Sequence, residues 1–95
     1  MANYRLAPNA KADLERIWLY GLEQWGLTRA DAYIEDLHKR FSEIAEHPLK
    51  YPAVEDVRAG HRRSVFKSDS IYYRVDGSDV EVMAIIGSQD IENWL

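Results

Sequence analysis

The chain has 95 residues, which predicts a single domain over residues 1–95. Its 46% of hydrophobic residues suffices for a folded core, and the absence of cysteine excludes disulfides, thiolate zinc sites and cysteine nucleophiles. With a net charge of −4, no signal-peptide pattern and no long apolar stretch, we expect a cytoplasmic protein that binds neither membranes nor, by default, nucleic acid.

The first part of the chain predicts a short strand followed by a helix. Residues 4–6 fit a strand, and Pro8 suits the first turn of a helix because its missing N–H costs nothing there. Apolar residues then recur every three or four positions as far as Trp25. Gly26 supplies a left-handed stop.

A second helix is predicted from Thr28 to the residues before Pro48. Thr28 and Asp31 resemble a capping box, with Asp in place of Glu. Because the connection to the first helix is short, the two helices should form an antiparallel hairpin. The charged face of the second helix is interpreted as solvated, with the ion pairs Glu35–Lys39 and Asp36–Arg40.

The second half of the chain changes to an alternating pattern typical of strands. The expected strands are 54–58, 61–67, 71–75 and 80–86. Asp76-Gly77 is a strong hairpin signal, and the last strand is apolar on both faces, which favours a central position. The predicted fold is α+β, with a short N-terminal strand and an antiparallel helix hairpin packed on an antiparallel sheet.

Positive charge gathers in one segment of this acidic protein. Residues 57–68 contain no acid. The segment holds Arg58, His61, Arg62, Arg63 and Lys67. It is either a local surface for anions or the solvated face of a strand, and the sequence leaves both interpretations open.

No motif for a metal, a phosphate loop or a nucleophilic elbow occurs, so we expect no metal, no cofactor and no catalytic residue. One enzymatic interpretation survives, in which arginines stabilise a phosphorane during RNA cleavage and a tyrosine or histidine moves protons. Its residues are Arg62, Arg63, Lys67, Arg74, Tyr72 and Tyr73. In the competing interpretation, a tyrosine belongs to the core and Arg74 pairs across the sheet.

Several segments, in their order and spacing, resemble ParE toxins of the RelE/ParE superfamily. They are residues 5–10 (RLAPNA), 17–18 (IW), 25–26 (WG), 57–63 (VRAGHRR), 71–75 (IYYRV) and 80–83 (VEVM). The resemblance covers essentially the whole chain and implies two helices packed on an antiparallel sheet.

The resemblance also implies a function. A ParE toxin belongs to a bacterial type II toxin–antitoxin system, which serves plasmid or chromosomal maintenance. It is not an enzyme: it causes growth arrest by trapping the cleaved DNA complex of DNA gyrase, here expected through the A subunit. A ParD-type antitoxin folds its C-terminal part onto the toxin and binds operator DNA with its N-terminal part. We therefore expect no sequence-specific DNA binding by this chain.

The ribonuclease branch of the superfamily provides an alternative. Its members are strongly basic and carry His or Tyr with Arg near the end of the last strand, whereas residues 84–95 here contain none of these. Many ParE toxins also carry Arg and His near the positions of Ala84 and Gly87. A member that binds its antitoxin but has lost its target is the third possibility.

Charge and exposure suggest the contact residues. For the target we expect Arg58, Arg62, Arg63 and Trp94. For the antitoxin we expect Arg62, Arg63, Arg74, Trp18 and Tyr72. A groove between the helix and sheet layers and the backbone at the sheet edges should receive the antitoxin segment.

Overall fold

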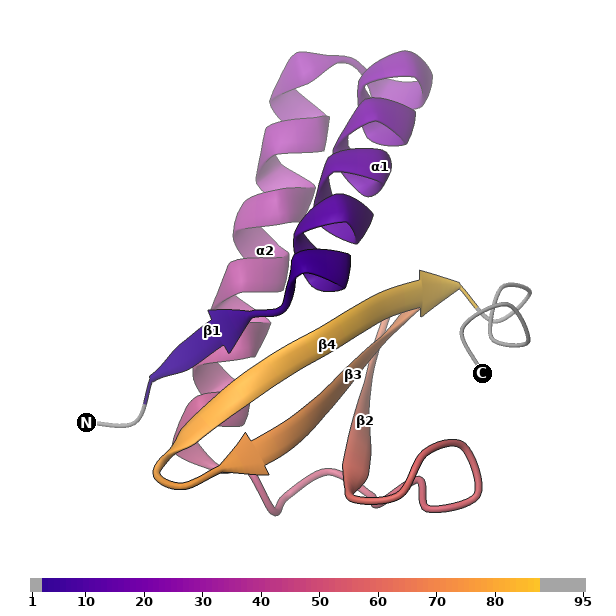
Figure 1. The fold of residues 1–95 in the computed structure, drawn as a ribbon. Coiled ribbons are helices and arrows are strands. Elements are labelled where there is room, and N and C mark those ends of the chain that lie inside the picture. Colours follow the sequence, from indigo (N-terminus) through magenta and orange to yellow (C-terminus); the bar gives the residue numbers. More distant parts are fainter. Residues whose placement is uncertain (1–2, 88–95) are drawn as a thin grey trace.

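The computed structural model describes residues 3–87. The elements are β1 (Tyr4–Leu6), α1 (Pro8–Trp25), α2 (Leu27–Glu46), β2 (His61–Phe66), β3 (Asp69–Asp76) and β4 (Asp79–Gly87). The two helices form a hairpin whose lower part lies against the sheet and whose tip extends beyond it (Figure 1). The predicted α+β fold with a helix hairpin is confirmed. Within the described residues, no helix is long and apolar enough to cross a membrane.

The sheet has the strand order β1-β4-β3-β2. β4 pairs antiparallel with β3, and β3 pairs antiparallel with β2, but β1 runs parallel to β4. The predicted antiparallel sheet is confirmed for β2, β3 and β4, and the N-terminal strand, whose partner the sequence did not predict, adds a parallel pair. No tight turn joins β1 to β4, so nothing in their connection imposes an antiparallel direction. β4 lies between two neighbours, as its two apolar faces predicted.

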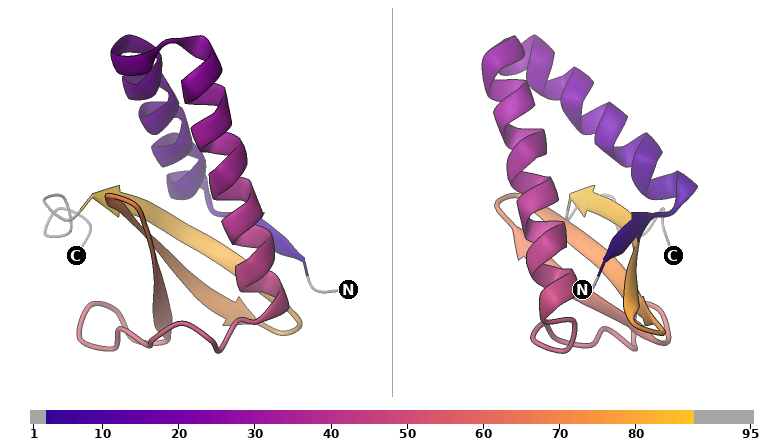
Figure 2. Two further views of the ribbon diagram at one scale, coloured as in Figure 1. Left: turned by 180° about the vertical axis from the view of Figure 1, so that it is seen from behind. Right: turned by 90° about the vertical axis from the view of Figure 1, so that its left-hand side faces the viewer.

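A single residue, Gly26, joins the two helices. Its φ of 90° lies in the region that glycine adopts without strain. Near this junction, a Cβ on Gly21 would lie 3.3 Å from the Ala30 Cβ, so glycine permits the close approach of α1 and α2. From the junction the helices diverge toward the sheet (Figure 2).

The second helix begins at Leu27, directly after Gly26, and its start has no side-chain cap. The predicted capping box at Thr28 and Asp31 was therefore wrong. The Asp31 carboxylate instead accepts a hydrogen bond of 2.8 Å from Trp18 Nε1 and so links the two helices.

The main core lies between the helices and the sheet, and a smaller apolar cluster lies on the opposite face of the sheet. The main core contains Ala10, Ile17, Leu37, Phe41, Ile44, Phe66, Ile71, Tyr73, Val80, Val82 and Ile85. The smaller cluster contains Val54, Tyr72, Ala84 and Ile86. Tyr72 pairs with Ala84 and Tyr73 with Val82, which leaves Met83 as an extra residue in β4. This bulge resets the alternation of side chains, so Val82 and Ile85 reach the same core.

The strand predicted over 54–58 was also wrong. The Val54 carbonyl accepts hydrogen bonds of 3.0 Å from the N–H groups of both Val57 and Arg58, which closes the chain into a turn. Only Ala53 forms an isolated bridge, with Arg62.

The outer edge of β2 is largely occupied. Segment 52–54 forms backbone hydrogen bonds with His61 and Arg63, and Arg40 donates a hydrogen bond of 2.9 Å to the carbonyl of Val65. Arg40 therefore contacts the sheet, contrary to the prediction of a solvated pair with an acid one helical turn earlier. A partner strand would find little free backbone at this edge.

Two side chains of α1 continue the β4 edge where β1 stops. β1 pairs with β4 only as far as Val82. Beyond Val82, the N–H of Ile85 donates a hydrogen bond of 2.9 Å to Asp13 Oδ2. Arg16 donates a hydrogen bond of 3.1 Å to the carbonyl of Ile85. Burial raises the pKa of Asp13, and the hydrogen bond from Ile85 opposes that rise. The pair thus satisfies both backbone groups of a fully buried residue.

This arrangement predicts a difference between two substitutions at Asp13. Asp13→Ala leaves the buried N–H of Ile85 without its acceptor, so the free energy of unfolding should fall by about 1–3 kcal/mol. Asp13→Asn retains an acceptor oxygen of similar shape and should cost less. Urea unfolding of the three proteins measures both effects, and equal midpoints for wild type and Asp13→Ala would contradict the assignment.

A second prediction concerns alkaline pH. Burial raises the pKa of Tyr73 to about 12, from an ordinary value of 10.0. Above pH 10 the unfolded chain loses a proton that the folded chain keeps, so stability should fall between about pH 10 and 12. Tyr73→Phe should make the free energy of unfolding less dependent on pH in this window. Unfolding midpoints measured against pH test this, and an unchanged slope would contradict it.

Candidate functional site

The arginines of the basic segment do not form one surface. Arg62 pairs with Tyr73, whose side chain lies in the core under the helices. The Nη1 of Arg62 donates a hydrogen bond of 2.7 Å to the carbonyl of Tyr51. Arg63 pairs with Tyr72, which belongs to the cluster on the opposite face. Directly paired residues share a face, so the sheet separates the two half-buried arginines.

Arg58 is exposed in the loop before β2. Arg58 and Lys67 are the two cations of the basic segment that are exposed and lie outside the strands. Trp94, the remaining residue expected to contact the target, lies outside the described residues.

Arg74 belongs to a network of charges on the helix-free face. Its Nη2 lies 2.6 Å from Glu81 Oε1 and 3.8 Å from Asp76 Oδ2. Arg5 forms ion pairs with the same two acids, and its hydrogen bond is the main cause that lowers the pKa of Asp76. The expectation that Arg74 pairs across the sheet is confirmed. Its charge is already balanced by acids of this chain.

The residues considered for RNA cleavage do not converge. Tyr72 is 3% exposed and Tyr73 is fully buried, on opposite faces of the sheet. Arg62 lies on the face of Tyr73, and Arg63 lies on the face of Tyr72. Lys67 lies in the turn between β2 and β3. Arg63, Tyr72 and Arg74 share the helix-free face, but the Tyr72 side chain is buried and Arg74 is paired with Glu81. The six groups therefore do not all face a common phosphate.

The tip of the hairpin exposes large apolar side chains that sequence reasoning placed in the core or did not single out. Tyr20 is 59% exposed and Trp25 is 42% exposed, and their rings meet edge to face with centroids 6.2 Å apart. Leu27 adds to this surface. Trp18, expected to contact the antitoxin, lies half-buried nearby, with its indole N–H bound to Asp31. Exposed aromatic clusters of this kind are typical of partner-binding surfaces.

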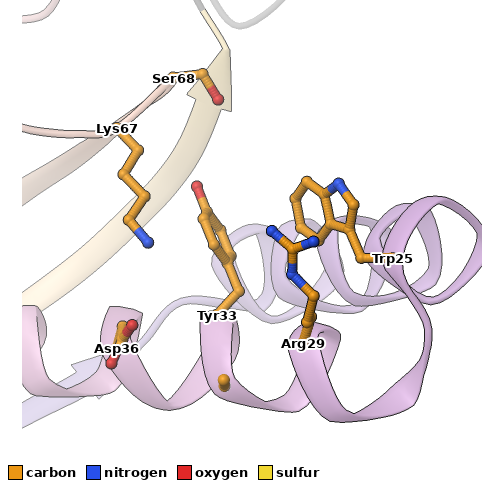
Figure 3. A pocket seen from close by; sticks show the side chains of 7 residues that line it. Trp25, Arg29, Tyr33, Asp36, Lys67 and Ser68 are labelled. Carbon is orange, nitrogen blue, oxygen red and sulfur yellow. The ribbon is translucent and has the colours of Figure 1, made fainter.

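A groove runs beneath this tip, between the helices and the turn that joins β2 to β3. It consists of two adjoining pockets of about 350 and 340 Å³, which share Trp25, Tyr33 and Ser68. The first continues along α2 as far as Asp36, and the second reaches Gly87 at the end of β4. We call the combined cavity the tip groove. Its first pocket is shown in Figure 3.

Aromatic packing builds the floor of the tip groove. The Tyr33 ring lies 5.8 Å from that of Trp25 and 5.5 Å from that of Phe66. The Tyr33 hydroxyl donates a hydrogen bond of 2.7 Å to Asp69 Oδ2, so this side chain is held at both ends. Burial, followed by the contact with Asp69, raises the pKa of Tyr33, which therefore stays neutral.

Two cations border the Tyr33 ring (Figure 3). The Arg29 guanidinium lies 5.9 Å from the centre of the Trp25 ring, and Lys67 Nζ lies 5.1 Å from that of Tyr33. Lys67 has a φ of 55°, as part of the tight turn between β2 and β3. Among residues 3–87, no carboxylate lies within ion-pair distance of either cation.

The tip groove has the chemistry of a recognition surface, with rings for apolar contacts and cations for an anion. The part of the chain that the structure describes has no group of three histidine, aspartate or glutamate residues placed to hold a metal ion. Sequence reasoning missed the groove because its two sides come from segments far apart in the chain, residues 25–36 and 67–69.

Comparison with known proteins gives a consistent result. The sequence profile described as "ParE toxin of type II toxin-antitoxin system, parDE" matches residues 4–91. Toxin ParE1 of Caulobacter vibrioides is 41% identical over 86 residues, which cover 90% of this chain and 88% of that protein. Toxin ParE1 of Mycobacterium tuberculosis is 30% identical over the same coverage.

The fold also has a counterpart among solved structures. A chain of the structure titled "Chromosomal ParDE TA system from P. aeruginosa" matches with a TM-score of 0.78, over 92% of this chain and 95% of the other. At 18% identity, this likeness concerns the fold. From the profile match over residues 4–91 and the 41% identity to a curated relative, the chain belongs to the ParE toxins of type II toxin–antitoxin systems.

Proposed function

We propose that this chain arrests bacterial growth by binding DNA gyrase, through its A subunit, and trapping the cleaved DNA complex, without catalysing a reaction itself. The observation that carries the proposal is the 41% identity to a ParE toxin over 90% of the chain. Its targets and its place of action would then be cytoplasmic. The aromatic tip and the exposed Arg58 offer surfaces suited to a protein partner.

We further propose that a ParD-type antitoxin neutralises the toxin in a tight complex. Family membership supports this, because the matched profile describes toxins of parDE systems. The accessible apolar side chains at the hairpin tip give such a partner a surface to bury. The sheet edges contribute less, since one edge is occupied by segment 52–54 and the other is the three-residue β1.

The ribonuclease alternative receives less support from the geometry. The two tyrosines considered for that reaction are buried on opposite faces of the sheet, and Arg74, which shares the face of Tyr72, is paired with Glu81. At the end of β4, Ala84 and Ile85 are fully buried and Gly87 is buried as well. This segment therefore presents neither an acid–base group nor a cation to a phosphate.

The gyrase proposal is tested with purified protein in supercoiling and plasmid-cleavage assays. We expect linear plasmid with covalently attached gyrase, and no such product when antitoxin is added before the toxin. Unchanged gyrase activity would contradict the proposal. Ribosome-dependent mRNA cleavage in the same preparation would then support the ribonuclease. No effect in either assay, with antitoxin binding retained, would identify a target-inactive member.

Reversal of charge at Arg62 and Arg63 tests the basic segment. If either face of β2 contacts gyrase or antitoxin, Arg62→Glu combined with Arg63→Glu should weaken growth arrest or antitoxin affinity about tenfold or more, because two cations become anions. Arg62 also holds the carbonyl of Tyr51, so the unfolding midpoint must be measured in parallel. Lys11→Glu on the exposed side of α1 is the control for a charge reversal away from β2. Wild-type arrest and affinity in the double variant would show that neither arginine contacts a partner.

A further inference from the structure

The tip groove combines features that a monomeric protein seldom leaves uncovered. Trp25 is 42% exposed although it packs against Tyr33 at the mouth of the groove. Large exposed rings beside a cavity favour contact with an apolar side chain of a partner. The shared lining of the two pockets provides room for such a side chain next to Trp25.

Besides an apolar side chain, the occupant of the groove should carry a negative charge, because two cations border the cavity. Arg29 and Lys67 approach the Tyr33 side of the groove from opposite walls (Figure 3). Neither lies within ion-pair distance of a carboxylate among residues 3–87, and each contacts an aromatic ring. The Tyr33 ring lies between the two cations (Figure 3), so a carboxylate beside this ring would gain a charge-assisted contact with one of them.

The backbone elements that carry these groups are tied together before a partner arrives. The hydrogen bond from Tyr33 to Asp69 ties α2 to the start of β3, and Lys67 sits in the tight turn just before it. Arg29 lies on the first turns of α2, which Gly26 joins directly to α1. A preorganised site loses less conformational entropy when it binds.

The acids at the groove argue for a peptide and against nucleic acid. Asp36 lines one end, and Asp69 lines the other pocket. They would repel the regularly spaced phosphates of a nucleic acid, and the net charge of −4 adds to that repulsion. A single carboxylate on a peptide can pair with one of the cations and avoid both acids.

We propose that the tip groove receives an acidic residue and a neighbouring large apolar residue of the antitoxin. The apolar side chain packs on Trp25, and the carboxylate pairs with Arg29 or Lys67 beside the Tyr33 ring. This inference rests on the proposed neutralisation by an antitoxin. It assigns that interaction to residues other than Arg62, Arg63, Arg74, Trp18 and Tyr72.

Photo-crosslinking locates the occupant directly. Ala32 lines the groove and is exposed, so a benzophenone amino acid placed there should crosslink to the full-length antitoxin bound to the whole chain. The same group at Ala12, exposed on α1, serves as the control. Mass spectrometry should find the crosslink within a few residues of an acid and a large apolar residue. A stable complex that crosslinks equally at both positions, or not at Ala32, would overturn the inference while leaving neutralisation intact.

Removing a cation and removing an acid from the groove should change the affinity for the antitoxin in opposite directions. Arg29→Glu combined with Lys67→Glu should weaken antitoxin binding about tenfold or more, whereas Asp36→Asn should tighten it about two- to threefold by removing a repulsion. Lys11→Glu should leave the affinity unchanged. Unfolding midpoints confirm that the variants fold. If Asp36→Asn weakens binding, or the double variant binds like wild type, the groove does not select an acid.

The design separates the inference from its premise. If the wild-type chain forms no complex with a ParD-type antitoxin, neutralisation itself fails, and the groove has no role in it. A single-stranded DNA oligonucleotide is the competing probe. Binding that is present in wild type and lost in Arg29→Glu/Lys67→Glu would overturn the peptide assignment in favour of nucleic acid.

Discussion

The connection of two long helices through Gly26 alone is the constraint on which the remaining structure depends. With one linking residue and a tight approach at Gly21, the helices must meet at their ends and diverge toward the sheet. Their lower parts bury the main core, while the tip extends beyond the strands (Figures 1 and 2). The geometry thus keeps Trp25 and Tyr20 accessible and forms a groove over the β2–β3 turn. The candidate binding surface therefore follows from the same contact that organises the core.

Whereas the helix junction keeps aromatic side chains accessible, the sheet restricts the arginines of β2 and β3. Alternation along β2 sends Arg62 toward the helices and Arg63 to the other face, and apolar clusters occupy both faces. Arg74 is neutralised by Glu81 in the neighbouring strand. The positive charge that is continuous in sequence is therefore divided in space. A role in binding is easier to assign to cations that protrude from loops and helix ends than to those held within strands.

Local signals predicted most of the fold. The apolar spacing identified both helices, Gly26 marked their junction, and Asp76-Gly77 marked the turn before the last strand. The errors arose where tertiary contacts decided the outcome. Asp31 accepts a hydrogen bond from Trp18 and does not cap α2 as expected. The carbonyl of Val54 accepts the hydrogen bonds of a turn where a strand was expected. The groove could not be predicted because Trp25 and Lys67 meet only through the packing of α2 on the sheet. Periodicity within one element carries no information about such a meeting.

The central claim is that this ParE toxin is recognised at its aromatic hairpin tip. The most direct measurement is a crystal structure of the full chain bound to its antitoxin. The account predicts that the antitoxin covers Trp25 and Tyr20 and places a carboxylate within ion-pair distance of Arg29 or Lys67. It would be contradicted if these four side chains remained exposed to solvent while the antitoxin covered only the helix-free face of the sheet.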